Sequence, residues 1–490
     1  MSLRSVWLLA AVAIVAIAAW PAFDSARGRF GGAAAAVATA APVIADYLRR
    51  DATVAFYERD VRRYPNDQIL TRMLAAQYLA RFREHFDIGD ALRAEHFARR
   101  SLAIQPAPNP GADMTLSSAL VVLHQFREAR RYAQAAWQLQ PWDASAAAAV
   151  ASLDMELGEY ETAGRILERP LTAREDPAWD TMVARLDELT GRLQTARDLI
   201  ARSARQADDV MDNPAEARAW YHWREGELAF EAGDMAAVEQ DERDALAIYP
   251  DYAKAWGMLA RMYWAQRRWP QAFDAAEKAS NLIPLPEYLG YKADAQAALG
   301  DASGYRQTRD LIRTVEFLGN VKGVNDRLIA TFYDEHGIYL NDALKIARRD
   351  LAARDDVFSE DTLAWALACK QRWSEARLHA ERAVRLNTPD ARLQFHAAVI
   401  ALHTGHPNEA RRRLQLALVL NAQFHPFYAD QARQLYDRLS HSWPVGAGVG
   451  VGTGRLNSNW SKVVLANAAM WLIRMVDLSN VMTLKPSISE

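Results

Sequence analysis

The 490-residue sequence predicts an all-α fold, a solenoid of about ten helix–turn–helix units that spans residues 45–440. Three observations support this prediction. One stretch contains two short helices with one apolar face each, a small residue recurs along the chain at nearly constant spacing, and prolines and glycines fall where helices should end. Together they indicate a chain built from one repeated helical hairpin.

The best-defined unit lies between Pro250 and Pro284. Its first half places four residues on one helix face, at relative positions 0, 3, 4 and 7: Trp256, Leu259, Ala260 and Tyr263. Residues 267–270 interrupt that pattern. A second apolar face then follows, with Ala272, Ala276 and Ala279. The unit therefore predicts two helices joined by a short turn.

A small residue marks the second helix of each predicted unit: Ala94, Ala129, Ala163, Ala196, Val238, Ala272, Ala302, Ala343, Ala376 and Ala410. Successive markers are 30 to 42 residues apart, and most are 33 to 35 apart. A small side chain suits the point where the two helices of a hairpin approach most closely, because a larger one would overpack the contact.

Helix-ending residues agree with this register. Prolines follow several second helices: Pro106, Pro141, Pro250, Pro284 and Pro389. Glycines fall in the turns inside the hairpins: Gly158, Gly191, Gly233, Gly300 and Gly405. Both sets predict chain reversals at the unit boundaries.

The pattern resembles the tetratricopeptide repeat, a 34-residue hairpin with large–x2–Leu–small–x2–Tyr in its first helix, an Ala in its second and a closing Pro. The resemblance covers roughly residues 45–439 and implies a right-handed superhelix whose first helices line a concave groove. It weakens at an apparent insertion over residues 82–97, which leaves the register of Ala94 open, and over residues 306–337, where we expect altered packing.

Both ends of the chain differ from the repeats. Residues 6–23 form an uncharged apolar run, so residues 1–24 predict a signal-anchor or a cleaved signal peptide, and we favour the uncleaved anchor. Residues 25–44 predict a Gly/Ala-rich tether and residues 441–459 a Gly-rich linker. For residues 460–490, an amphipathic membrane-surface helix and a capping helix both stay open. We expect an inner-membrane anchor with an extracytoplasmic solenoid, or export after cleavage.

Composition excludes several function classes. A net charge of −3 argues against a dedicated nucleic-acid binder. Cys369 is the single cysteine, which excludes intramolecular disulfides and Cys-x-x-Cys zinc or haem sites. No nucleophile elbow, zinc-protease motif, P-loop or kinase set occurs. We therefore expect no enzyme activity, no cofactor, no metal and no small-molecule substrate.

Two polar clusters raise the question of a metal or hydrolytic site. His396, His403 and His406 lie close in sequence, yet no cysteine or suitable carboxylate other than Glu409 is near to complete a zinc site. The acidic cluster of residues 334–336, with Asp350, Asp355 and Asp356, is explained by solvated helix ends. An enzyme built on either cluster stays only as a distant alternative.

In the repeat register, seven residues are expected on the concave groove as candidates for partner binding: Trp220, Trp223, Phe230, Lys254, Arg261, Trp264 and Tyr291. Aromatic side chains beside Arg and Lys suit an extended peptide. The alternative is that some of these aromatics fill the core between helices. The predicted function is a non-catalytic scaffold or assembly factor for a protein partner, and the alternative is a subunit of an envelope export or polysaccharide machine.

Overall fold

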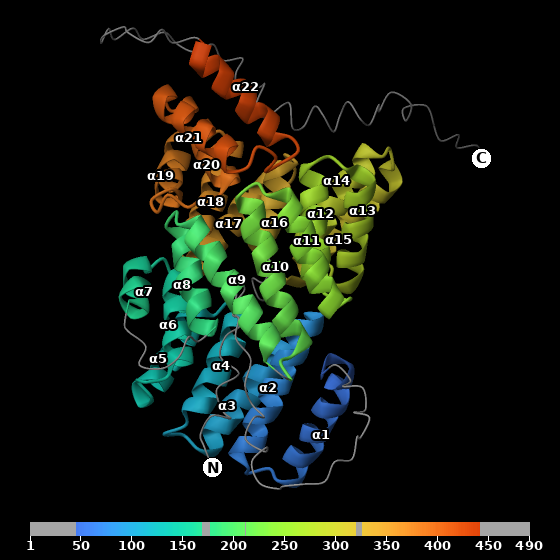
Figure 1. The fold of residues 1–490 in the computed structure, drawn as a ribbon, viewed down its shortest axis with the longest axis vertical. Coiled ribbons are helices and arrows are strands. Elements are labelled where there is room, and N and C mark those ends of the chain that lie inside the picture. Colours follow the sequence, from blue (N-terminus) through green and yellow to red (C-terminus); the bar gives the residue numbers. More distant parts are fainter. Residues whose placement is uncertain (1–45, 169–176, 211, 320–325, 442–490) are drawn as a thin grey trace, which may run out of the picture.

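The computed structural model describes residues 46–168, 177–210, 212–319 and 326–441, and all regular elements in these ranges are helices (Figure 1). The all-α prediction is confirmed. In chain order the helices are η2 (Asp46–Arg49), α1 (Arg50–Arg63), α2 (Gln68–His85), α3 (Ile88–Ile104), α4 (Pro110–Val122), α5 (Phe126–Leu139), α6 (Ala144–Glu156), α7 (Tyr160–Leu167), α8 (Pro177–Leu189), α9 (Leu193–Asp209), α10 (Ala215–Glu231), α11 (Met235–Ile248), α12 (Ala253–Ala265), α13 (Trp269–Leu282), α14 (Pro286–Ala298), α15 (Ala302–Gly319), α16 (Asp326–Glu335), α17 (Leu340–Ala353), α18 (Val357–Cys369), α19 (Trp373–Ala383), α20 (Ala391–His403), α21 (Pro407–Leu420) and α22 (Tyr428–His441).

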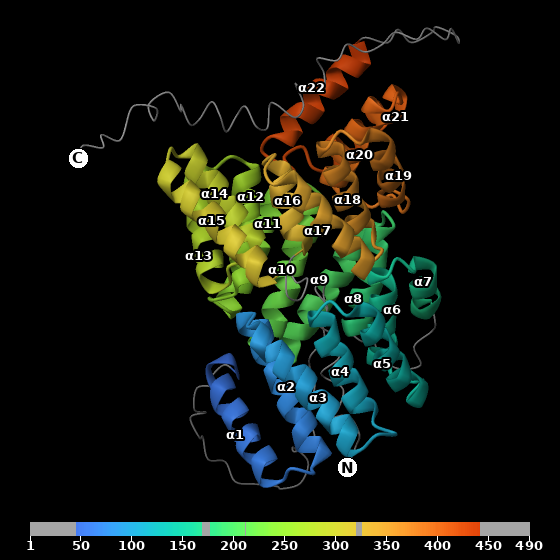
Figure 2. The same cartoon turned by 180° about the vertical axis from the view of Figure 1, so that it is seen from behind.

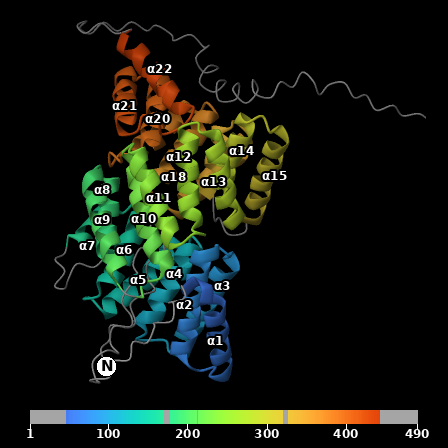
Figure 3. The same cartoon turned by 45° about the vertical axis from the view of Figure 1, so that its right-hand side comes forward.

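The helices form consecutive hairpins. From α2–α3 to α20–α21, ten neighbouring pairs within the described residues pack against each other, and each pair packs on the next (Figures 1 and 2). Figure 3 shows this stacking where α12, α13, α14 and α15 lie side by side. Helix α22 follows the last hairpin and buries Tyr428, Ala429, Ala432 and Leu435 against it.

The predicted terminal segments lie outside the described residues. This holds for the anchor, the tether, the C-terminal segment and all but the first residue of the predicted glycine-rich linker. None of the helices that the structure does describe combines the length and the apolar character that a bilayer crossing requires.

The small marker residues lie where the two helices of each hairpin meet. All of them except Ala302 are fully buried, with 0% exposure. Ala302 is wrong as a marker, because it is the first residue of α15 and only half-buried, while the fourth position of that helix is occupied by buried Tyr305. The apparent insertion at residues 82–97 is also no inserted loop, because α2 simply runs to His85 and α3 starts at Ile88.

The turns inside the hairpins need a left-handed backbone residue. Gly158, Gly191, Gly233, Gly300 and Gly405 all have φ between 72° and 87°. Other hairpins place a non-glycine residue there, as at His124, Arg267 and Gln371, with φ between 57° and 59°. The predicted positions of these five glycines in the turns inside the hairpins are thereby confirmed.

The superhelix closes on itself after about six units of 34 residues. The turn inside an early hairpin contacts the loop that follows a much later hairpin, through partners 191 to 199 residues apart in sequence. Three hydrogen bonds define this seam: the backbone N–H of Val357 to the Tyr160 hydroxyl (2.9 Å), the Thr388 hydroxyl to the Leu189 carbonyl (2.8 Å), and the Asn421 side-chain N–H to the Phe230 carbonyl (2.7 Å).

Candidate functional site

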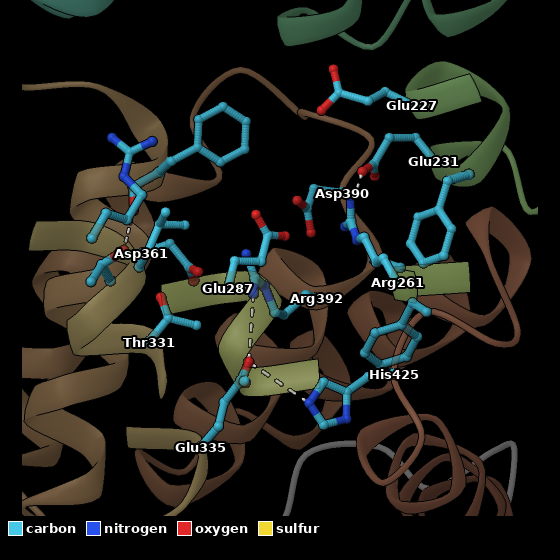
Figure 4. A pocket seen from close by; sticks show the side chains of 18 of the residues that line it. Glu227, Glu231, Arg261, Glu287, Thr331, Glu335, Asp361, Asp390, Arg392 and His425 are labelled. Atoms are coloured by element: carbon cyan, nitrogen blue, oxygen red, sulfur yellow. Dashed lines mark hydrogen bonds and ion pairs between the residues drawn. The ribbon is translucent and has the colours of Figure 1, made fainter. Parts of the chain in front are cut away.

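Closure of the superhelix encloses its concave surface in a cavity of about 250 Å³ (Figure 4). The first helices of seven consecutive hairpins contribute to its wall, namely α8, α10, α12, α14, α16, α18 and α20, together with the loops before α20 and α22. Concave cavities with aromatic walls and a few convergent polar groups are the usual binding sites of proteins. This cavity is therefore the candidate site.

Five of the seven predicted groove residues line this cavity: Trp223, Phe230, Arg261, Trp264 and Tyr291. The winding of the superhelix places these five residues around one cavity instead of along an open groove. Three of them also pack into a core between helices, with exposures of 1% for Phe230, 5% for Trp264 and 9% for Tyr291. Whether they bind a partner stays a prediction.

Trp220 and Lys254 are not among the lining residues. Trp220 is 4% exposed and packs in the core with Tyr221, Tyr249 and Tyr252. The Lys254 ammonium lies 4.7 Å from the centroid of the Trp223 ring, and burial lowers its pKa. Lys254 therefore contacts the lining residue Trp223 but does not itself line the cavity.

At the α8–α10 side of the cavity, buried charges form a closed network. Arg185 lies 2.8 Å from Glu188, Arg224 also pairs with Glu188, and Arg224 lies 2.7 Å from Glu227. Burial would raise the pKa of Glu188, but the two guanidinium groups hold it below its usual value. The network places two guanidinium groups against the buried carboxylate of Glu188.

His336 is held as an imidazolium at the α14–α16 side. Its Nδ1 lies 2.7 Å from the carbonyl oxygen of Phe332 and its Nε2 lies 2.7 Å from Asp294, so both nitrogens donate. Burial alone would lower the pKa of His336, but Asp294 and the carbonyl raise it. Asp294 also accepts a 2.7 Å hydrogen bond from the Trp264 indole, which fixes this wall.

Glu335 lies between two donors, as Figure 4 shows. Its carboxylate is 3.5 Å from Arg392 and 3.7 Å from Nε2 of His425. Nδ1 of His425 accepts backbone N–H bonds from residues 427 and 428, which puts the proton of the neutral ring on Nε2, facing Glu335. Burial would raise the pKa of Glu335, but His425 and Arg392 lower it to about 2.

The sequence-based assignment of residues 334–336, Asp350 and Asp356 to solvated helix ends is wrong. Asp334 is 5% exposed, His336 8%, Asp350 2% and Asp356 5%, and only Asp355 of that group is exposed. Asp350 and Asp356 are buried where the superhelix closes on an earlier turn, whereas Asp334 and His336 are buried between neighbouring hairpins, against Cys369 and Asp294. The partners of Asp350 and Asp356 include Arg327 and Arg354, and Arg354 lies 3.3 Å from Glu156 across the seam. Helix periodicity alone does not indicate this burial.

The three histidines near residue 400 have separate surroundings. His396 faces Asp361 at 3.0 Å and stacks on Trp365, whereas His403 stacks on Trp373 with ring centroids 3.9 Å apart. His406 precedes α21 and is exposed. In the ranges that the structure covers, no group of three or more histidine, cysteine or acidic side chains is arranged to hold a metal ion.

Comparison with known proteins gives a match to a family model and a likeness to solved structures. A tetratricopeptide-repeat family model matches residues 120–186, from the end of α4 into α8. The crystal structure of yeast Tom70 is similar at 12% sequence identity with a TM-score of 0.33, over 78% of this chain and 96% of that one. No curated protein matches. The family match, continued on both sides by hairpins of the same kind, supports the tetratricopeptide-repeat superfamily.

Proposed function

We propose that this protein is a non-catalytic interaction scaffold that binds a segment of a partner protein at the concave cavity. The main support for this proposal is that the first helices of seven consecutive hairpins all contribute aromatic and charged side chains to the wall of one cavity. Tetratricopeptide repeats are protein-binding modules, and their concave surface is the extended recognition surface of such solenoids. Buried tryptophan, tyrosine and arginine residues are also the side chains that dominate binding energy at protein interfaces.

The closed seam restricts what can enter. The cavity, of about 250 Å³, has room for one long side chain or a chain end. An extended peptide lying along an open groove would need the seam between Tyr160 and Val357 to open. The partner therefore inserts a projecting group, while its remaining contacts lie around the cavity mouth.

Site-specific photocrosslinking tests this proposal. A photoreactive residue replaces Thr331, a half-buried lining residue of α16, and a matched control replaces Leu378, which is 50% exposed on α19. Capture of one discrete protein from Thr331 and not from Leu378 is the expected result. Equal labelling from both positions, or none from either, would mean that the concave surface is a structural spacer.

We further propose that the scaffold works outside the cytoplasm, attached through residues 6–23, as part of a cell-envelope assembly. This proposal is supported by the uncharged apolar run in the sequence. Fractionation of cells and mass measurement of the mature N-terminus test it. Recovery in the membrane with residues 1–24 intact supports an anchor, whereas recovery as a cytoplasmic protein would contradict both anchor and export.

A further inference from the structure

The cavity wall contains more carboxyl groups than guanidinium groups. Nine aspartate and glutamate residues and five arginines line it. Each of the five arginines already has a carboxylate partner: Arg185 and Arg224 pair with Glu188, Arg261 with Glu231, Arg327 with Asp356 and Arg392 with Glu335. These arginines are therefore already bonded to carboxylates, and they reach Glu287, Asp361 and Asp390 only through longer-range electrostatic interactions, from Arg261 and Arg392.

Five carboxylates at the wall have no lysine or arginine within ion-pair distance among the described residues: Glu287, Asp294, Asp334, Asp361 and Asp390. Asp294 is paired with His336, and three of the others are labelled in Figure 4, namely Glu287, Asp361 and Asp390. Glu287 accepts a hydrogen bond from the Tyr291 hydroxyl at 2.6 Å. Asp390 caps α20 by accepting from a backbone N–H at 2.9 Å, and Asp361 has only His396, at 3.0 Å. Since a carboxylate offers about four acceptor sites, each retains unused capacity.

Unsatisfied buried groups lie at the same wall. His396 is 3% exposed, and its Nδ1 faces Asp361, so in the neutral ring the proton lies on Nδ1 and Nε2 is an acceptor. That Nε2 has no hydrogen-bond donor in the described structure, and neither do the two oxygens of Asp334. Buried polar groups are normally satisfied, so these atoms can take a hydrogen bond from a bound group or from an ordered water.

The wall also shows that it can accommodate a planar cation. The Arg261 guanidinium lies 4.2 Å from the centroid of the Phe230 ring, and the Arg327 guanidinium lies 5.6 Å from that of Phe358. In addition, burial and the nearby Asp390 raise the pKa of Glu231 to about 8, as expected where negative charge is incompletely balanced.

We infer that this cavity binds a guanidinium group, presented as an arginine side chain of the partner; this inference rests on the proposed function. A guanidinium has five N–H donors in one plane, and the free acceptors lie on α14, α18 and the loop before α20. An ammonium group has three donors on a compact ion and matches acceptors on several walls less well. The cavity volume also fits one side chain of this length.

Titration calorimetry with matched small probes tests the inference on the full chain. The probes are N-acetyl-arginine amide and N-acetyl-citrulline amide, which have the same shape but differ in charge and in donor number. We expect the citrulline probe to bind at least about tenfold more weakly, because it loses a charge-assisted hydrogen bond. Equal affinities, or no detectable binding of the arginine probe, would overturn the inference.

Substitutions of the carboxylates that line the cavity test whether the arginine probe binds there. Glu287→Gln and Asp390→Asn should each weaken the arginine probe about tenfold, and asparagine retains the helix cap at position 390. Asp274→Asn, on the exposed face of α13, is the control and should leave the affinity unchanged. Circular dichroism confirms that each variant is folded. Two folded wall variants with parental affinity would contradict the site.

The crosslinking experiment separates the two proposals. If Thr331 captures a partner but the arginine probe does not bind, the scaffold stands and the guanidinium inference fails. If the probe binds and no partner is captured, the cavity takes a free guanidino compound, and both the scaffold proposal and the protein source of the guanidinium fail. If both occur, excess arginine probe should displace the partner from the Thr331 crosslink.

Discussion

The seam between superhelical turns can be tested at a glycine. Gly158 and Gly405 occupy equivalent hairpin turns, with φ of 77° and 83°. A Cβ at position 158 would lie 2.2 Å from the carbonyl oxygen of Asp355, whereas a Cβ at position 405 meets nothing within 4 Å. Gly158→Ala therefore adds a clash across the seam to the backbone strain that both substitutions share.

The expected loss of unfolding free energy follows from the backbone strain and from the clash across the seam. A left-handed conformation costs an L-residue about 1–2 kcal/mol, and the loss of unfolded-state freedom returns about 0.4–1 kcal/mol. Gly405→Ala should thus lower the free energy of unfolding by about 1 kcal/mol. The clash at Gly158 adds about 1–3 kcal/mol of overpacking, because a backbone oxygen of the later turn must move and the hydrogen bond between Tyr160 and Val357 lies beside it.

Urea denaturation followed by circular dichroism measures the difference, provided that the dependence on urea concentration is the same for all variants. Gly233→Ala serves as an intermediate case, because its Cβ would lie 3.0 Å from the carbonyl oxygen of Leu420. The expected order of destabilisation is Gly158, then Gly233, then Gly405. Equal destabilisation of Gly158→Ala and Gly405→Ala would refute the seam.

Three further outcomes follow. Tyr160→Phe removes the acceptor of the buried Val357 N–H and should cost about 1–3 kcal/mol of unfolding free energy by urea denaturation; a cost near zero would show that this bond is dispensable. Burial raises the pKa of the Glu242 carboxyl, and neither of its oxygens has a hydrogen-bond partner in the described structure. Above the usual pKa of a glutamate, the folded protein therefore keeps this proton while the unfolded chain releases it. The free energy of unfolding consequently falls as the pH rises. Glu242→Gln should therefore raise the melting temperature more at pH 8 than at pH 5, and an equal effect at both would contradict a protonated Glu242. Ala376→Phe should cost about 1–3 kcal/mol by overpacking, whereas Ala302→Phe, at a half-buried helix start, should cost much less, and reversal of that order would contradict the hairpin register.

The helices and their turns could be predicted from the sequence because their causes are local. Periodic apolar residues define the helix faces, and residues such as Gly191 or Ala376 mark turns and close contacts within one hairpin. The marker failed at Ala302, since in that unit a tyrosine three residues later fills the contact. Local errors of this kind do not change the fold class.

The candidate site was predicted only in part because its cause is not local. The repeat register placed Trp223, Arg261 and Trp264 on the concave side, and they line the cavity. The closure of the superhelix arises from contacts between residues nearly 200 positions apart, and the burial of Asp334 and His336 arises from contacts with the hairpins on either side, at Cys369 and Asp294. No feature of a single repeat indicates how tightly the superhelix winds, so the closure had no signal in the sequence.

The seam also bears on how the chain folds. In an open repeat array each unit touches only its neighbours, so folding can start anywhere and ends can fray independently. Here the bonds of Leu189 with Thr388 and of Phe230 with Asn421 tie units that are far apart along the chain. Such contacts require closure of long loops before they form, which slows folding. In return, the middle of the array should unfold as one cooperative block.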